Sequence, residues 1–197
     1  MLAPGYTDIP EGHIASVTTY LHMREQPSAK PVQAPAGLSV RHFPMPDLAW
    51  YRKLFWAVGG NWLWFSRLRM DDGQLAAILH DERVDVLALI QGKQAKGLLE
   101  LDRRRFPDIE LAFFGLTEDL FGRGAGRYLM GVAIEKAWSF QPERFHVHTC
   151  TNDHPKALNF YIKSGFSPYR QAVEVAPDPR LTGELPCTAA PHVPLLG

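Results

Sequence analysis

Residues 108–138, DIELAFFGLTEDLFGRGAGRYLMGVAIEKAW, are the stretch of sequence that decides the fold. The run 109–116 is apolar almost throughout except for Glu110, which predicts a strand buried on both faces. A loop with three glycines follows at 122–126, and apolar residues spaced three and four apart then predict an amphipathic helix. A glycine-rich turn at a helix N-terminus presents unpaired N–H groups beside the positive end of the helix dipole. The stretch therefore predicts an anion-binding site, for which phosphate is the usual ligand.

The composition indicates a soluble globular protein of one ordinary domain. The chain has 197 residues, of which 46% are hydrophobic, and its 21 Lys plus Arg balance its 21 Asp plus Glu. This balance argues against nucleic-acid or membrane-surface partners, which normally require a basic excess. There is no basic leader followed by an apolar run and no stretch of eighteen apolar residues. We therefore expect a cytoplasmic protein without a membrane partner.

The order of strand and helix signals predicts a mixed α/β fold with β, β, α, α, β, β, β, α, β, α, β along the chain. Alternating residues over 13–24 predict a half-buried strand, and the proline-rich segment 26–37 reads as a linker. The expected organisation is an N-terminal strand and linker (1–36), one domain (37–176) and a loosely structured tail (177–197). The N-terminal strand either extends one edge of the sheet or crosses to a second subunit to make a homodimer, and the sequence leaves both open.

Two nucleotide-binding motifs do not fit the glycine loop. A Walker A loop requires Gly-Lys followed by Ser or Thr, whereas Gly126 precedes Arg127 and Tyr128. A Rossmann fingerprint has its glycines spaced as G-x-G-x-x-G in the first βα unit, followed by an acidic ribose partner. Here the spacing is G-x-G-x-G, the loop comes late in the chain, and the next strand ends in polar, uncharged residues at 149–152.

Residues 110–166 resemble the cofactor-binding core of the GNAT superfamily of N-acetyltransferases, and in detail a bacterial branch of it. The family motif is a buried strand, (Arg/Gln)-x-x-Gly-x-(Gly/Ala), a helix, then Asn-x-x-Ala, Tyr and Gly-Phe. The positions that match it are Gly124, Gly126, Ala157, Tyr161, Gly165 and Phe166. In element order the resemblance extends from about residue 38 to residue 175, and it implies a central mixed, mostly antiparallel sheet flanked by helices.

Two positions depart from the family pattern. Phe121 stands where Arg or Gln is expected, and His154 stands where Asn is expected. The first departure matters less, because the loop of this family binds pyrophosphate mainly through backbone N–H groups, and nearby arginines add charge-assisted contacts. The second removes a side-chain hydrogen bond to the pantetheine arm, for which Asn152 is a substitute.

The resemblance implies transfer of acetyl from acetyl-CoA to an amine, a small molecule in our prediction, by direct attack in a ternary complex. A protein N-terminus or lysine as the acceptor stays open, and a non-catalytic acyl-CoA-binding or sensing module on the same fold is the alternative. The implied cofactor-binding residues are Phe114, Gly115, Leu116, Phe121, Gly122, Arg123, Gly124, Ala125, Gly126, Arg127, Asn152, His154, Ala157 and Tyr161.

Three groups are candidates for the chemistry that the resemblance implies. Glu110 is the candidate general base, with Glu100 or a water as rivals, and strict alternation along the strand places it on the face that carries Phe114 and Leu116. Tyr161 is the candidate acid that protonates the departing thiolate. The backbone N–H of Leu116 is the candidate donor to the oxyanion.

Other polar and aromatic residues have simpler interpretations. His146 and His148 lie at i and i+2 of one expected strand, but no third ligand is fixed nearby, so we expect no metal. Cys150 is a buried thiol or, with His148 as base, a nucleophile. Most of the aromatic group is expected in the core, with one or two rings lining the acceptor site and favouring a hydrophobic or cationic amine: Trp50, Tyr51, Trp56, Trp62, Trp64 and Phe65.

Overall fold

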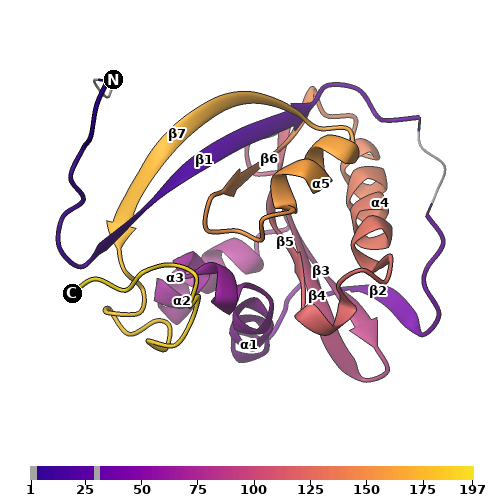
Figure 1. Ribbon diagram of the computed structural model, residues 1–197. Coiled ribbons are helices and arrows are strands. Elements are labelled where there is room, and N and C mark those ends of the chain that lie inside the picture. Colours follow the sequence, from indigo (N-terminus) through magenta and orange to yellow (C-terminus); the bar gives the residue numbers. More distant parts are fainter. Residues whose placement is uncertain (1–3, 29–31) are drawn as a thin grey trace.

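The computed structural model describes residues 4–28 and 32–197 and contains a seven-stranded sheet in the order β2-β3-β4-β5-β6-β1-β7 (Figure 1). The strands are β1 (His13–Met23), β2 (Leu38–His42), β3 (Val84–Gln91), β4 (Gln94–Asp102), β5 (Asp108–Leu116), β6 (Arg144–Cys150) and β7 (Ser167–Pro177). All neighbours are antiparallel except β5 and β6, which run parallel. The predicted mixed, mostly antiparallel sheet is thus confirmed.

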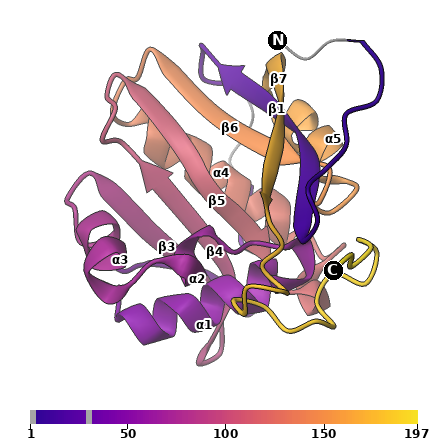
Figure 2. The same cartoon turned by 90° about the vertical axis from the view of Figure 1, so that its left-hand side faces the viewer.

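Helices cover both faces of the sheet (Figure 2). They are α1 (Leu48–Gly59), η1 (Gly60–Trp62), α2 (Ser66–Arg69), α3 (Asp72–Leu79), η2 (Glu118–Leu120), α4 (Ala125–Trp138) and α5 (Ala157–Lys163). One apolar core lies between the sheet and α4, and a second lies between the sheet and α1 with α3. Within the described residues, no helix combines the length and apolar character that crossing a bilayer requires.

Local signals explain where the helices begin and end. The Asp47 side chain accepts the N–H of Trp50 at the start of α1, and Asp71 forms a capping box with Gln74 at the start of α3. Gly165 follows α5 with φ of +104°, a conformation that favours glycine. The backbone of these elements is therefore specified within a few residues of each boundary.

The N-terminal strand lies inside the sheet rather than at its edge. β1 pairs antiparallel with β6 from Thr18 to Met23 and with β7 from His13 to His22. Leu21 and Met23 are buried in the α4 core. Both expected placements, at the edge of the sheet or on a second subunit, were therefore wrong. Part of the expected linker, residues 29–31, and residues 1–3 lie outside the described residues.

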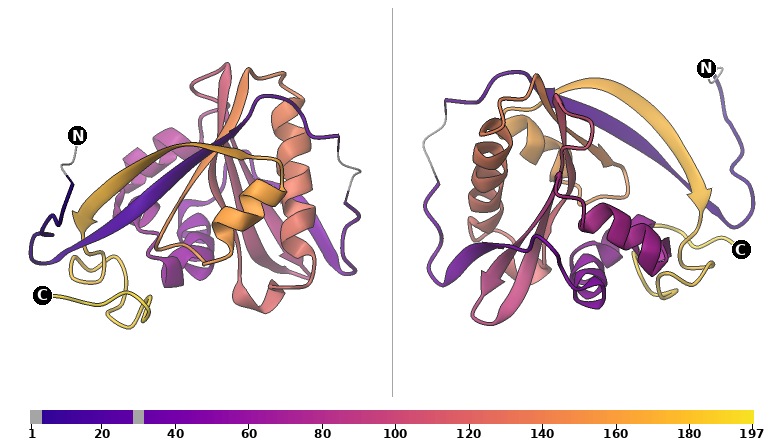
Figure 3. Two further views of the ribbon diagram at one scale, coloured as in Figure 1. Left: turned by 45° about the horizontal axis from the view of Figure 1, so that its top comes forward. Right: turned by 180° about the vertical axis from the view of Figure 1, so that it is seen from behind.

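β5 contains a bulge that divides the sheet into two parts. Glu100 of β4 pairs with Phe113, but the next residue, Leu101, pairs with Leu111, so Ala112 is an extra residue on β5. A bulge bends its strand and increases the local twist. β5 pairs with β6 only from Asp108 to Leu111, and the two strands separate at the bulge. Beyond that point β6 leaves β5, and β1 and β7 arch over toward the C-terminal tail (Figure 3).

The C-terminal tail contains no described helix or strand, yet it is anchored through a buried arginine. Arg180 is 4% exposed and donates to the Asp178 carboxylate at 2.7 Å. The same guanidinium donates to tail carbonyls, at 2.8 Å for Val193 and 3.0 Å for Pro194. Leu185 also belongs to a small apolar cluster with Ile14 of β1 and Leu63. The division of the chain into 1–36, 37–176 and 177–197 stays a prediction, although β1 is built into the sheet of the central part.

Replacing Arg180 should loosen the tail and destabilise the protein. In Arg180→Ala, the buried Asp178 carboxylate loses its partner, so we expect the free energy of unfolding to fall by about 3 kcal/mol. Urea unfolding measures this loss, and limited proteolysis measures exposure of the tail. Arg83→Ala is the matched control, because Arg83 pairs with Asp81 at the same spacing on the surface. Equal stabilities of the two variants would show that the Arg180 contacts do not hold the tail.

Candidate active site

A cavity of about 850 Å³ lies where β5 and β6 separate. One side is formed by the loop before α4 and by α5, and the other by the η1–α2 segment with β1 and β7. The three candidate catalytic residues line it, as do all of the expected cofactor-binding residues except Arg123 and Ala125. Ala125 is fully buried in the α4 core, and Arg123 is exposed. The sequence motifs therefore converge on one cavity from separate elements.

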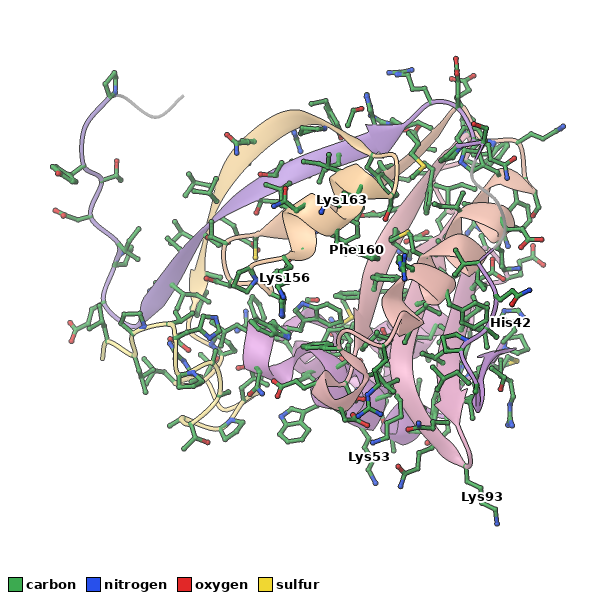
Figure 4. The ribbon with its side chains drawn as sticks, turned by 45° about the vertical axis from the view of Figure 1, so that its right-hand side comes forward. His42, Lys53, Lys93, Lys156, Phe160 and Lys163 are labelled. Carbon is green, nitrogen blue, oxygen red and sulfur yellow. The ribbon has the colours of Figure 1, made fainter. Side chains whose placement is uncertain are left out.

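The start of α4 forms an end of the cavity suited to an anion. The first hydrogen bond of the helix runs from Tyr128 N–H to Gly124 C=O at 3.1 Å, so the amides at 125–127 precede the ladder. Gly124 has φ of +79° and supplies no side-chain cap. Arg127 and Lys156 add positive charge to the lining, and Lys156 lies on the α5 side (Figure 4). Backbone donors and two cations at a helix N-terminus fit a phosphate group.

The edge of β5 that faces the gap is open for backbone pairing. Thr117 N–H donates to Lys96 C=O at 2.8 Å, toward the β4 side. Because successive residues of a strand direct their backbone groups to opposite sides, those of Leu116 and Phe114 point toward the gap. Beyond Leu111, no pairing with β6 is described. This arrangement leaves N–H and C=O groups of β5 available to an extended ligand.

The bulge places Glu110 on the opposite face of the sheet from the one expected. Ile109, Leu111, Phe114 and Leu116 all pack on the α4 side, which a strictly alternating strand could not achieve. The extra residue Ala112 shifts the alternation by one, so that Phe114 and Leu116 point to the same face as Leu111. The prediction that Glu110 shares a face with Phe114 and Leu116 was therefore wrong. Glu110 points to the α1 side, across the sheet from the start of α4.

On that face, Glu110 forms a pair with His148 of β6. Glu110 Oε1 lies 3.3 Å from His148 Nδ1. The hydrogen bond from His148 lowers the pKa of Glu110, and the same bond raises the pKa of His148 above its usual value. The carboxylate is therefore ionised, and the imidazole is the member of the pair that exchanges a proton near neutral pH.

The rival carboxylate, Glu100, is withdrawn from the cavity. It is 0% exposed and does not belong to the lining. Arg67 donates to its Oε1 at 2.5 Å, and the Tyr51 hydroxyl donates to its Oε2. Both oxygens are thus occupied inside the α1 core, whereas Glu110 lines the cavity.

Tyr161 places its phenol at the wall of the cavity within an aromatic cluster. The residue is 7% exposed and packs edge-to-face against Phe114, Phe160 and Phe166. Burial raises the pKa of Tyr161 well above its usual value, and the Asp153 carboxylate raises it further. The hydroxyl is therefore protonated near neutral pH and can act as a hydrogen-bond donor.

The two residues that depart from the family motif contact each other. The rings of Phe121 and His154 meet edge-to-face with centroids 5.2 Å apart. His154 also meets Trp62 edge-to-face at 5.0 Å, so its ring joins the loop before α4 to η1. All three rings line the cavity. At positions 121 and 154, ring packing therefore replaces the polar side chains that the family motif has there.

Asp153 and Trp64 both line the cavity and contact each other, which the sequence did not predict. Trp64 Nε1 donates to Asp153 Oδ1 at 3.0 Å, and the other carboxylate oxygen accepts from Thr149 Oγ1 at 2.7 Å and Cys150 N–H at 2.9 Å. The Trp64 bond connects the segment before α2 to the segment before α5 across the gap. Only the adjacency of Asp153 to the motif position His154 hints at this contact in the sequence.

Cys150 lies close to this contact but is poorly suited as a nucleophile. Burial raises the pKa of its thiol, and the nearby Asp153 carboxylate raises it further. The nucleophilic form of cysteine is the thiolate, which a raised pKa disfavours.

A family model matches most of the elements that line this cavity. The model of the acetyltransferase (GNAT) family matches residues 41–166, which is more than half of the chain. The chain belongs to the GNAT acetyltransferase family. The match includes β5, α4, β6 and α5, whereas β1, β7 and the tail lie outside it. No curated protein sequence matches the chain.

Solved structures share the GNAT fold at low sequence identity. A GCN5-related N-acetyltransferase from Sphaerobacter thermophilus has a TM-score of 0.60 at 11% identity, covering 84% of this chain and 53% of its own. A tandem GNAT protein from the clavulanic acid biosynthesis pathway has a TM-score of 0.58 at 15% identity, covering 86% and 54%. An aminoglycoside acetyltransferase from an uncultured soil metagenomic sample, in complex with sisomicin, has a TM-score of 0.56 at 15% identity, covering 70% and 93%. The chain thus spans about half the length of the first two.

Removing the Glu110 carboxylate should lower the pKa of His148. Glu110 raises that pKa by favouring the charged imidazole. In Glu110→Gln the desolvation of His148 is opposed only by the more distant Asp153 and Glu174, so the midpoint should fall by about one pH unit. NMR titration of the histidine ring protons measures it. His22 is the internal control, because burial, Arg24 and Arg144 lower its pKa and none of these changes. An unchanged His148 midpoint would show that the two side chains do not interact in solution.

Proposed function

We propose that this GNAT acetyltransferase transfers acetyl from acetyl-CoA to the amine of a small molecule by direct attack. The observation that carries the proposal is the cavity in the β5–β6 gap, which holds the parts of the site together. Free helix amides lie at one end of it, and the Glu110–His148 pair lies on the opposite face of the sheet. The open edge of β5 connects the two. The anion site and the open backbone edge suit the acyl donor, and the proton acceptor beyond them suits the amine that receives the acyl group.

The residues present fit coenzyme A along its length. The amides at 125–127, with Arg127 and Lys156, would hold the pyrophosphate. The backbone groups of Phe114 and Leu116 that point toward the gap would pair with the pantetheine amides. Acetyl-CoA supplies the activated acetyl thioester. The N–H of Leu116 would stabilise negative charge on the carbonyl oxygen during attack.

The Glu110–His148 pair would remove the proton from the acceptor amine. An amine with a pKa near 10 is neutral in only about one molecule in a few thousand at pH 7, which is equivalent to roughly 4–5 kcal/mol of barrier. A neutral His148 would accept this proton, and the ionised Glu110 would stabilise the resulting imidazolium. We therefore assign Glu110 a role in general base catalysis that it exerts through His148.

Tyr161 would protonate the departing thiolate. Burial weakens the phenol as an acid, but a thiolate that develops in the same dry pocket becomes a stronger base for the same reason. The difference between the two pKa values, rather than either value alone, then controls the transfer. A protonated Tyr161 at the wall of the cavity fits this role.

The acceptor end of the cavity suits a cationic or partly apolar amine. Its lining combines the carboxylates of Glu110 and Glu174 with the rings of Trp64 and Phe65. Two arginines that also line the cavity are neutralised by ion pairs, Arg67 with Glu100 and Arg104 with Asp102. Carboxylates attract an ammonium group, and aromatic faces stabilise a nearby cation. This composition supports an amine acceptor rather than an anionic one.

Acetyl-CoA together with a panel of small amines should release free thiol, and Gly126→Val should abolish this release by blocking cofactor binding. A Cβ at Gly126 would point between Leu116 and Phe160, at 3.7 Å from each side chain, so a valine would fill part of the cavity. Calorimetry measures CoA binding, and a thiol reagent measures turnover. Gly131→Val in the same helix is the matched control, because Gly131 is not a lining residue. CoA binding with no thiol release for any amine would favour the sensing module instead.

Tyr161→Phe should lower kcat by about tenfold to a hundredfold while CoA affinity changes little, because the ring packing is kept and only the proton donor is lost. Steady-state kinetics with the best amine from the panel, with calorimetry of CoA binding, separates the two effects. An unchanged kcat would exclude Tyr161 as the acid, and a parallel loss of CoA affinity would indicate a role in binding.

A further inference from the structure

β7 is a long edge strand with an open side. It runs from Ser167 to Pro177 and pairs only with β1, at the end of the strand order. Both of its faces are largely exposed, and three apolar side chains are more than 40% exposed: Tyr169, Val173 and Val175. Figure 3 shows β7 along the outer margin of the arch. Soluble proteins usually shorten, cover or charge such an edge, because it can pair with another chain.

The hydrogen bonding to β1 determines which groups β7 presents outward. Asp178 N–H donates to Gly12 C=O at 2.9 Å, and the register with β1 continues without a shift to the Tyr20–Arg170 pair. The even-numbered residues of β7 therefore direct their backbone groups toward β1. The odd-numbered residues 171, 173 and 175 direct theirs to the open side. Any further strand must form its hydrogen bonds with these odd-numbered residues.

This parity restricts how a second β7 could pair antiparallel about a two-fold axis. Odd-numbered residues must then lie opposite odd-numbered residues, so the axis passes at a residue and not between two residues. At the centre of the segment the candidate positions are 171, 172 and 173. With the axis at Ala172, Arg170 lies opposite Glu174 of the second copy, and Glu174 lies opposite its Arg170. The other two positions do not bring these charges together. In the Ala172 register both charge pairs are at non-hydrogen-bonded positions, where opposite side chains are closest.

The two charged residues are available for such pairing. Among the described residues, neither Arg170 nor Glu174 takes part in an ion pair, and both are exposed. Arg170 lies 3.8 Å above the Tyr20 ring. Four residues along an extended strand separate the two by about 13 Å, too far for them to pair within one chain. Pro168 and Pro177 bound the segment and lack the N–H that would extend a ladder.

We propose that two copies of this chain associate through antiparallel pairing of their β7 edges, with the two-fold axis at Ala172. The Arg170–Glu174 pair then forms twice, and Tyr169 lies opposite Val175 of the second copy on the other face. The interface joins the two sheets into one continuous sheet. Glu174 also lines the cavity, so Arg170 of the second copy lies beside the acceptor end of the site. The association does not depend on the proposed reaction.

Charge reversal with sedimentation analysis tests this arrangement. The full chain should sediment with twice the mass of one chain. Arg170→Glu alone and Glu174→Arg alone each place like charges opposite each other twice, so each should raise the dimer dissociation constant at least about tenfold. An equimolar mixture of the two variants restores both opposite-charge pairs and should recover the dimer. Arg41→Glu, the same reversal on the other edge strand β2, is the matched control and should leave the mass unchanged.

Val173→Pro provides a test that does not depend on charge. It removes an N–H that points away from β1, so the dimer should be lost while β1–β7 pairing, monitored by circular dichroism, is kept. A monomeric wild-type chain overturns the proposal. So does a dimer that persists in both single charge variants, or a mixture of the two that remains monomeric.

Discussion

The bulge at Ala112 is the constraint on which the arrangement of the site depends. An extra residue on β5 ends its pairing with β6 after Leu111, which creates the gap that holds the cavity. The same residue reverses the faces of the strand, so Glu110 and the pair Phe114 and Leu116 point to opposite sides of the sheet. A regular β5 would pair with β6 along its whole length and close the gap. Separation of the strands and division of the chemistry between two faces therefore have one cause.

The strand β6 is paired with β5 over only part of its length, and β1 holds β6 in place by pairing with it on the other side. The strands β6, β1 and β7 form a three-stranded arm that is joined to the rest of the sheet by only four residue pairs. Because β1 comes first in the chain and β6 and β7 come last, the arm ties the two ends of the sequence together. The hydrogen bond from Trp64 to Asp153 adds a connection across the gap. The width of the cavity thus depends on contacts distant in sequence from the residues that line it.

The sequence predicts the local parts of this structure well and the long-range parts poorly. The caps at Asp47 and Asp71 and the glycine loop before α4 depend on neighbours within a few residues, so their signals are present in the sequence. The bulge has no such signal, because Ala112 is an ordinary strand residue and its extra position is defined only by pairing with β4. The Glu110–His148 contact follows from that pairing and was missed for the same reason. The place of β1 depends on which strands pair with it on either side, which alternation alone does not specify.

The two glutamates on adjacent strands show how environment rather than residue type assigns a role. Glu100 and Glu110 both point to the α1 side, yet Glu100 is fully buried with both oxygens engaged by Arg67 and Tyr51. Removing Arg67 would leave the Glu100 charge uncompensated in the core, so Glu100 cannot exchange a proton with a ligand without breaking a buried ion pair. Glu110 has its partner at the cavity wall, and that partner is a histidine, whose proton can leave near neutral pH. On this face, the route that we propose for a proton taken from a ligand therefore runs through His148, with Glu110 behind it.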